Sequence, residues 1–387
     1  MSMRVVQVNY VADAAIPSPD ALLDRYFTLT GWSEAIRAAG TVDVRVVQRF
    51  PRADRRTRGG IEYVFCEDDR QLAAAAAAFD PQIVHVNGIV FPVRTWRLRS
   101  RLPASAAVVV QSHSDGGAIG RAPLLRAAGR LLRGAVDAFL FAAPEHADAW
   151  RAAGFIGARG LSRAAERVYY VMPASTSFRP VPRAEARAES RISGNPSVLW
   201  VGRLNANKDP LTALDGFERA LAALPDATLT MVYSTTELLA EVRARIESSS
   251  ALRSRVRLTG EVPHDRLPAF FSAADLFLVG SHHEGSGYSL MEAMACGAVP
   301  IVTDIPTFRV MTGGSIGALW KPGDAADCAR ALRETRARDL DAERRKLAKH
   351  FERELSWEAV GKKAIEIYQS VVRSRESVVS RESRVGS

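Results

Sequence analysis

Strand-like and helix-like segments alternate along this chain in two long runs, with an irregular stretch between them. In the first run, helical patterns at residues 32–39, 71–79 and 123–132 separate short apolar segments. The strand candidates are residues 4–10, 43–49, 61–65, 83–87, 107–111 and 137–142. Such alternation predicts a parallel sheet with helices on both faces.

The second run repeats this pattern, and 387 residues suffice for about two domains. Its strand candidates are residues 197–201, 227–232, 255–259, 275–279, 299–302 and 317–320. We therefore predict an α/β fold of two doubly wound Rossmann-like domains that face each other across a cleft. The expected parts are an N-terminal domain (1–180), a linker (181–196), a C-terminal domain (197–356), a closing helix (357–372) and a disordered tail (373–387).

Cysteine usage and hydropathy favour a reduced, cytoplasmic chain. The three cysteines Cys66, Cys296 and Cys328 are widely separated, and no pair has the spacing of metal ligands. The first residues are typical of a strand rather than of a signal peptide. No apolar run is long enough to span a bilayer.

The formal charge is +9, and the basic excess is uneven. Residues 94–133 contain eight arginines and a single acid, Asp115. This excess suits peripheral contact with anionic lipid at the inner membrane face, whereas a solvated pair of helix faces is the competing interpretation. Nucleic acid is not expected as a partner, because Trp96 is the one aromatic residue among these arginines that could stack on bases.

Three histidines lie in or just after strands of the first half. His85 is inside a strand and is expected to be buried and hydrogen-bonded. His146 is expected on an exposed first helical turn. His113 follows a strand in a polar, glycine-rich loop, and ligands of doubly wound sheets bind beyond the carboxyl ends of the strands. We therefore expect a site role for His113.

In the second half, a glycine-rich turn between a strand and a helix carries two carboxylates, Glu284 and Glu292, eight residues apart. Free backbone N–H groups and the positive end of a helix dipole suit a phosphate, and the glutamates suit hydroxyl groups beside it. In the alternative interpretation, Ser289 and Glu292 form a capping box and Glu284 is a solvated loop residue.

A second loop follows the strand at residues 197–201 and carries Arg203 and Lys208. An arginine can bind a phosphate with two hydrogen bonds, and a lysine adds a point charge. The alternative is two surface cations near helix ends. Because both loops follow strands of one parallel sheet, we expect them at the same edge, facing the cleft.

Five segments together resemble the retaining GT-B glycosyltransferases of family 4, the group 1 glycosyl transferases. They begin Val201-Gly-Arg-Leu-Asn-Ala-Asn-Lys, Leu258-Thr-Gly-Glu-Val-Pro-His, Ala274-Asp-Leu-Phe-Leu, Glu284-Gly-Ser-Gly-Tyr-Ser-Leu-Met-Glu and Gly317-Ala-Leu-Trp-Lys-Pro-Gly-Asp. The resemblance is strongest over residues 198–327 and loose in the N-terminal half.

The resemblance implies a nucleotide-sugar donor held mainly by the C-terminal domain, without a metal or cofactor. Arg203 and Lys208 would neutralise the leaving diphosphate, Glu284 would hold the transferred hexose, Glu292 the ribose, and His113 would contact the sugar near the reacting carbon. Of these, His113, Arg203, Lys208 and Glu284 form the expected catalytic group. The expected donor contacts are Gly202, Arg203, Lys208, Val262, Glu284, Gly285, Ser286, Gly287, Tyr288, Ser289, Leu290 and Glu292.

Three departures from the family pattern stand out. The Gly-Gly loop after the first strand would fall near Leu23-Asp24, which has no such glycines. The usual glycine-rich turn after residues 227–232 is replaced by Tyr233-Ser-Thr-Thr, and an acidic residue by Ser175-Thr176.

The function expected from the resemblance is transfer of a hexose, with retention and without a metal, to a glycan, glycolipid or small-molecule acceptor. The alternative is a non-catalytic GT-B module that binds a nucleotide-sugar or polysaccharide, and the missing Gly-Gly loop is its support. A phosphorylase is less favoured, because no motif for a pyridoxal phosphate lysine is found.

Overall fold

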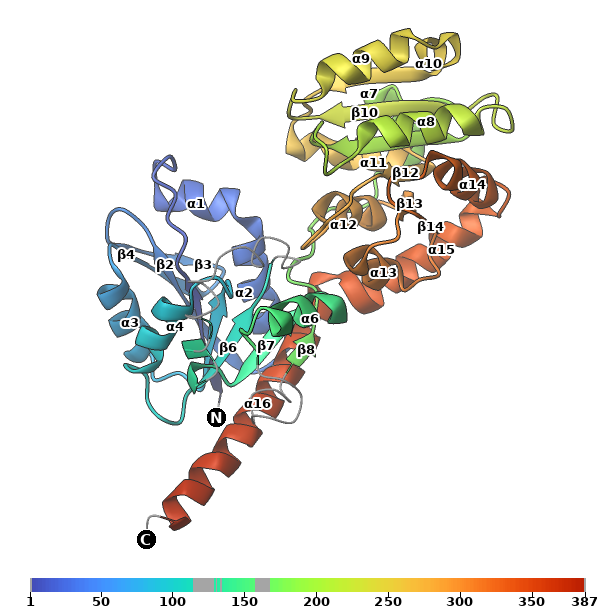
Figure 1. Ribbon diagram of the computed structural model, residues 1–387. Helices are drawn as coiled ribbons and strands as arrows, with labels where there is room; N and C mark the ends of the chain where they lie inside the picture. The colour runs from blue at the N-terminus through green and yellow to red at the C-terminus, as the bar shows by residue number, and fades with distance from the viewer. Residues whose placement is uncertain (1, 114–128, 130, 133, 157–167, 386–387) are drawn as a thin grey trace. The chain divides into compact units, whose positions relative to one another are not determined.

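The computed structural model describes residues 2–113, 129, 131–132, 134–156 and 168–385. These residues belong to two compact units, one formed by Met1–Ala174 with Trp357–Ser387 and the other by Ser175–Ser356 (Figure 1). Each unit has one sheet of mainly parallel strands connected by helices. The α/β prediction, with two doubly wound parts, is therefore confirmed.

The first unit contains a sheet in the order β3-β4-β2-β1-β5-β6-β7-β8. Its strands are β1 (Met3–Asn9), β2 (Val42–Arg49), β3 (Asp54–Arg58), β4 (Ile61–Cys66), β5 (Ile83–Asn87), β6 (Ala107–Gln111), β7 (Ala138–Phe141) and β8 (Val168–Tyr170). The strand pairs are parallel except β3–β4 at one edge. Central strands such as β6 are buried along their whole length, as expected for a sheet covered on both faces.

The described helices of this unit are α1 (Pro19–Arg25), α2 (Phe27–Ala39), α3 (Asp69–Ala77), α4 (Pro92–Arg99), α6 (Pro144–Ala152) and α16 (Trp357–Val385). The last of them, α16, follows the second unit in sequence but packs along α2. A Cβ atom on Gly361 would lie 2.4 Å from the Ala35 carbonyl oxygen, and one on Gly31 would lie 2.4 Å from the Trp357 ring. These glycines therefore allow the two helices to approach closely.

The second unit contains a parallel sheet in the order β11-β10-β9-β12-β13-β14. Its strands are β9 (Ser197–Gly202), β10 (Thr228–Tyr233), β11 (Val256–Gly260), β12 (Leu276–Val279), β13 (Val299–Thr303) and β14 (Ala318–Trp320). Its helices are α7 (Arg183–Ser190), α8 (Pro210–Ala220), α9 (Leu239–Glu247), α10 (Ser250–Arg255), α11 (Leu267–Ala273), α12 (Tyr288–Ala295), α13 (Pro306–Thr312), α14 (Ala325–Arg336) and α15 (Leu340–His350), with short helical turns at His264–Arg266 and Phe351–Leu355.

The structure differs from the sequence-based expectations in two edge strands. The β3 strand, Asp-Arg-Arg-Thr-Arg, has no apolar alternation because it lies at an exposed edge. The β8 strand has three residues, which is too short for a periodic signal. The helix expected at residues 123–132 falls largely outside the described residues.

The boundaries between the parts of the chain also differ from the predicted ones. The units divide after Ala174 rather than at residue 180, and the expected linker contains the helix α7. The closing helix continues to Val385, through most of the stretch expected to be a disordered tail. Arg375 anchors it, because its guanidinium donates to the Asp137 carboxylate at 3.0 Å and to the Ala104 carbonyl.

Two histidines of the first unit are buried. His85 is fully buried and hydrogen-bonded to Tyr368 and Gln111, so its prediction is confirmed. His146 was expected to be exposed, which is wrong. It lies in the first turn of α6, where Pro144 and Glu145 are exposed, but His146 itself is on the buried face of the helix with Ala147 and Trp150.

The three cysteines are free and buried. Among the helices that the structure describes, none combines the length and the apolar composition needed to cross a membrane.

Candidate functional site

The two loops singled out in the second half leave neighbouring strands. The first loop follows β9 and the second follows β12, and β9 pairs with β12 in the sheet. The chain adds β10 and β11 on one side of β9, and then β12, β13 and β14 on the other. This reversal of strand order is the topological switch point, where doubly wound sheets bind their ligands.

Backbone contacts hold these loops together. The His282 N–H donates to the Asn207 carbonyl at 2.9 Å, and the His283 N–H donates to the Asn207 side chain at 3.0 Å. Asp209 has a φ of 41°, in the left-handed region that favours glycine, and its carboxylate lies 3.1 Å from His282 Nε2. A Cβ atom on Gly280 would lie 2.9 Å from the Asp209 carbonyl oxygen. The loop conformations are therefore fixed by several independent contacts.

Lys208 and Glu284 form an ion pair between the loops, from Nζ to Oε1. Their side chains are 12% and 14% exposed, so the pair is largely shielded from water. Arg203, at the start of the first loop, is exposed and has no side-chain partner among the residues that the structure describes. The Lys208 ammonium is thus held in place by Glu284, whereas the Arg203 guanidinium is exposed to solvent.

The glycine-rich turn between Glu284 and α12 ends at Gly287, the N-cap of the helix. Gly287 has a φ of 63°, and an added Cβ atom would lie 2.8 Å from the Met311 sulfur. The cap residue of this helix is a glycine, and within the described part of the chain no side-chain hydrogen bond caps the helix at Gly287. Its N–H groups and helix dipole are therefore suited to an anion.

The capping-box alternative for Glu292 is wrong. The helix begins at Tyr288 with Gly287 as its cap, so Ser289 is already inside the first turn. The buried Glu292 carboxylate instead lies 2.8 Å from His264 Nε2. This hydrogen bond raises the pKa of His264.

Sequence reasoning missed His264 as a site residue, although its segment belonged to the resemblance. It follows Val262, which lies on the loop after β11 and is half-buried. The His264 ring is 4.7 Å from the Phe178 ring, centroid to centroid. The loop that carries Val262 is therefore connected to Glu292 through one histidine.

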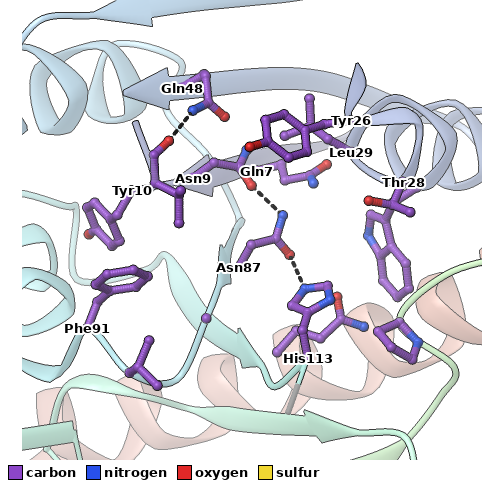
Figure 2. A pocket seen from close by; sticks show the side chains of 16 residues that line it. Gln7, Asn9, Tyr10, Tyr26, Thr28, Leu29, Gln48, Asn87, Phe91 and His113 are labelled. Atoms are coloured by element: carbon purple, nitrogen blue, oxygen red, sulfur yellow. Dashed lines mark hydrogen bonds between the residues drawn. The ribbon is translucent and has the colours of Figure 1, made fainter. Parts of the chain in front are cut away.

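His113 lies at the end of β6 in the first unit and lines a cavity of about 320 Å³. The cavity opens at the carboxyl ends of β1, β5 and β6, and β1 and β5 flank the switch point of this sheet. His113 Nε2 lies 3.3 Å from the Asn87 side-chain oxygen, and Asn87 donates to Asn9 at 2.5 Å (Figure 2).

Sequence reasoning did not identify the amide side chains of this cavity. Asn9, Asn87 and Gln111 each end an apolar strand, and Val8-Asn9 and Val86-Asn87 repeat the same pair of residues. A polar amide at the carboxyl end of a buried strand is the signal that could have found them.

The place predicted for the Gly-Gly loop is also corrected. Leu23 and Asp24 lie inside α1, where Leu23 is buried and Asp24 pairs with Arg58. The segment that directly follows β1 is residues 10–18, so counting back from Gly40 placed the loop too late.

Within the part of the chain that the structure describes, no three His, Cys, Asp or Glu side chains are grouped so as to hold a metal ion.

Comparison with known proteins agrees with this geometry. Residues 195–337, which include both loops and α12, match the family described as glycosyl transferases group 1. The GDP-mannose:cellobiosyl-diphosphopolyprenol alpha-mannosyltransferase of Xanthomonas campestris is 32% identical over 166 residues, which cover 41% of this chain and 42% of that protein. The match therefore spans less than half of the length of this curated relative.

Solved structures match over nearly the whole chain. The sucrose-phosphate synthase of Thermosynechococcus elongatus has a TM-score of 0.67 and 20% identity, with 96% of this chain and 100% of that chain covered. An alpha,alpha-trehalose-phosphate synthase (UDP-forming) of Burkholderia vietnamiensis has a TM-score of 0.66 and 17% identity, with 97% and 100% covered. The chain thus has the GT-B fold, and residues 195–337 of its second unit match the model of the glycosyl transferases group 1 family.

Proposed function

We propose that this protein is a metal-independent, retaining glycosyltransferase. It would move a hexose from a nucleotide-diphosphate sugar to a glycan, a glycolipid or a small-molecule acceptor. The observation that carries the proposal is the Lys208–Glu284 pair beside the uncapped turn at Gly287, at the switch point of a group 1 domain. The names of the relatives support it, because one transfers from GDP-mannose and another forms UDP.

Each site residue has a proposed role. Arg203 and Lys208 neutralise the diphosphate, and the amides of residues 287–289 contact the same group. Glu284 holds hydroxyls of the hexose, and Glu292, fixed by His264, holds those of the ribose. Gly202, Gly285, Ser286, Tyr288 and Leu290 shape the same pocket, and Val262 lies against the base. His113 contacts the sugar near the reacting carbon.

These roles fit the chemistry of the step. The bond between the anomeric carbon and the phosphate oxygen breaks, the acceptor oxygen bonds to that carbon, and negative charge develops on the leaving diphosphate. Fixed cations and helix amides stabilise this charge where water is excluded. The leaving phosphate takes the acceptor proton, so no enzymic nucleophile is required. Donor binding would separate Lys208 from Glu284. Lys208 would then contact the diphosphate, and Glu284 the hexose.

The alternative is a non-catalytic module that binds a nucleotide-sugar or polysaccharide. A thermal-shift screen with UDP, GDP, ADP and their sugars identifies the nucleotide, because a ligand of the native state raises Tm. Mass spectrometry then follows donor hydrolysis and transfer with the stabilising sugar. Hydrolysis that Lys208→Ala abolishes supports the enzyme. Binding without turnover of any donor, across a broad acceptor panel, would establish the module instead.

We also propose that the protein is cytoplasmic and touches anionic lipid at the inner membrane face. The basic stretch at residues 94–133 suggested this, but Arg121, Arg126, Arg130 and Arg133 lie outside the described residues. Of the others, Arg94 pairs with Asp69, and Arg99 donates to the Ala106 carbonyl at 2.5 Å. Among the residues that the structure describes, the side chains of Arg97 and Arg101 have no such partner.

The lipid contact is therefore centred on the outer face of α4. Arg97 is exposed on this helix, as are Trp96 and Val93, which are 47% and 38% exposed, and Arg101 is exposed in the turn just after it. Vesicles containing phosphatidylserine should bind the protein, and binding should fall steeply with salt. The double variant Arg97→Ala/Arg101→Ala should weaken it, whereas Arg37→Ala, at a distant helix, should not. Absent or salt-independent binding would refute the contact.

A further inference from the structure

The cavity of the first unit is lined by amides and aromatic rings rather than by charges. Of the described residues that line it, none is Asp, Glu, Lys or Arg. Its amides are those of Gln7, Asn9, Gln48, Asn87 and Gln111, and its rings include Tyr10, Tyr26, Trp32 and Phe91 (Figure 2). A cavity of this composition can form neutral hydrogen bonds and ring contacts with a ligand.

A chain of buried hydrogen bonds fixes the direction of the Gln111 amide. Trp32 Nε1 donates to the Tyr368 oxygen at 3.2 Å, so the Tyr368 O–H donates to His85 Nδ1. Burial lowers the pKa of His85 to about 3, so the ring is neutral and its proton is on Nε2. That N–H donates to Gln111 Oε1 at 3.2 Å. The Gln111 Nε2 atom is left, buried and without a partner among the described residues, at the cavity wall.

A second, shorter chain fixes the Asn9 amide in the same sense. Asn87 Nδ2 donates to Asn9 Oδ1 at 2.5 Å, and Asn87 Oδ1 accepts from His113 Nε2 at 3.3 Å. The Asn9 oxygen is thus engaged by the protein. Its Nδ2 atom is buried and also has no partner within the described residues.

Both chains have the same result, although they share no residue. Asn9 is 7% exposed and Gln111 is 1% exposed, and each directs its acceptor into the protein and leaves its N–H donors unpaired. Tyr10, which also lines the cavity, has a buried hydroxyl without a partner among the described residues. Buried polar groups are normally hydrogen-bonded, so these unpaired groups around one cavity indicate a ligand with acceptor oxygens.

We infer that this cavity binds an uncharged glycosyl residue, whose hydroxyl oxygens accept hydrogen bonds from Asn9 Nδ2 and Gln111 Nε2. The inference rests on the proposed function, in which this residue belongs to the acceptor. A phosphorylated sugar fits less well, because recognition of phosphate uses arginine or lysine. Arg94 stacks on Tyr10 and Phe91, and its guanidinium is drawn to Asp69 at 2.9 Å, a carboxylate that also lies 3.4 Å from Arg49.

The test uses the full chain and saturation-transfer NMR titrations. The neutral probes are methyl α-glucopyranoside, methyl α-mannopyranoside, maltose and cellobiose, and the anionic probes are glucose 6-phosphate and mannose 6-phosphate. We expect at least one neutral probe to bind, and each phosphate to bind more weakly than its parent sugar. No neutral binding, or tighter binding of the phosphates, would overturn the inference.

Near-isosteric variants test the direction of the donors. Asn9→Asp and Gln111→Glu keep the inward acceptor oxygen and replace the N–H donors by a carboxyl oxygen, which also brings an ionisable group to a buried position, so each should weaken neutral-sugar binding at least about tenfold. Gln71→Met, at an exposed glutamine on α3, is the matched control and should leave binding unchanged. Unchanged binding in both cavity variants would refute the assigned donors.

Two further measurements separate the possible failures. If a carboxylate variant does not fold, as judged by circular dichroism, Asn9→Ser or Gln111→Met replaces it with the same expected loss. Nucleotide binding and donor hydrolysis are measured on the same samples. If no neutral sugar binds but nucleotide binding and donor hydrolysis are retained, the inference about this cavity fails and the proposed function stands. If no nucleotide binds, the proposed function itself is contradicted.

Discussion

The two units have the same kind of sheet but opposite chemistry at their switch points. Between β9 and β12 the second unit gathers ionic groups, with Lys208 paired to Glu284 and Arg203 exposed nearby. Between β1 and β5 the first unit gathers amides, with Asn87 bonded to Asn9. A doubly wound sheet therefore determines where a ligand can bind, and the loop and strand-end residues determine which ligand.

The two switch points also differ in how their polar groups are paired within the protein. The second unit pairs the shielded charged groups of its site internally, Lys208 with Glu284 and Glu292 with His264, and leaves Arg203 exposed. The first unit leaves Asn9 Nδ2 and Gln111 Nε2 without partners among the described residues. An unpaired buried donor costs about 1–3 kcal/mol, less than an unpaired buried charge.

The largest expected effect comes from the ion pair. Lys208→Met alone leaves the Glu284 carboxylate unpaired, and should destabilise the second unit by about 3 kcal/mol. The double variant Lys208→Met/Glu284→Gln should recover most of the Tm, but turnover should remain at least ~100-fold below that of the wild type. Thermal unfolding and mass-spectrometric turnover measure the two effects. Recovery of turnover together with Tm would mean that the pair is structural.

The second prediction concerns pH, where the two units should respond in opposite directions. Burial lowers the pKa of His85 to about 3, so His85 stabilises the fold fully above the unfolded pKa, and this contribution decreases as pH falls. At pH 5 the loss should be about 2 kcal/mol. The bond with Glu292 raises the pKa of His264, so its contribution is present below the unfolded pKa and is lost as pH rises through the folded pKa.

Variants that cannot titrate separate these contributions. In His85→Gln, the fall of Tm from pH 7 to pH 5 should be smaller than in the wild type. In His264→Gln, the change of Tm between pH 6 and pH 8 should be reduced instead, and by less, because the His264 side chain is 56% exposed. Identical pH profiles for the wild type and His85→Gln would contradict the neutral buried ring.

The third prediction distinguishes the two glutamates of the second unit. Glu292→Gln should weaken binding of the preferred nucleoside diphosphate about tenfold, because a hydrogen bond to a charged group is lost. With the dideoxy form of the same nucleoside diphosphate, which lacks the ribose hydroxyls, Glu292→Gln and the wild type should bind equally. Isothermal titration measures both, with Glu352→Gln, an exposed residue of the same unit, as the control. An equal loss with both nucleotides would remove Glu292 from the ribose site.

The smallest effect should come from salt. Raising NaCl from 50 to 500 mM should weaken nucleotide binding severalfold, because Arg203 is exposed and its charge is screened. Binding of a neutral sugar to the first unit should change less than twofold. Parallel titrations measure both affinities. If the affinities for the nucleotide and for the neutral sugar fall equally with salt, the proposed difference in charge between the two switch points is wrong.

Much of the fold was predictable from residue patterns. The six strands of the second unit begin and end within one residue of their predicted bounds, because buried parallel strands are short apolar runs between glycines and polar loops. The pattern failed at β3, an arginine-rich edge strand, and at α16 beyond residue 372, where Arg375 binds Asp137. Both depend on partners that are distant in the sequence.

The sequence alone determined the alternation of strands and helices, the division into two sheets and the charged loops of the second unit, because these depend on local residue types and spacing. Tertiary structure decided which partner each polar group has. It paired Glu292 with His264 instead of Ser289, joined Lys208 to Glu284, and left the N–H donors of Asn9 and Gln111, two residues that line a cavity, without partners among the described residues. Hydrogen-bond direction depends on contacts across the fold, which residue spacing does not contain.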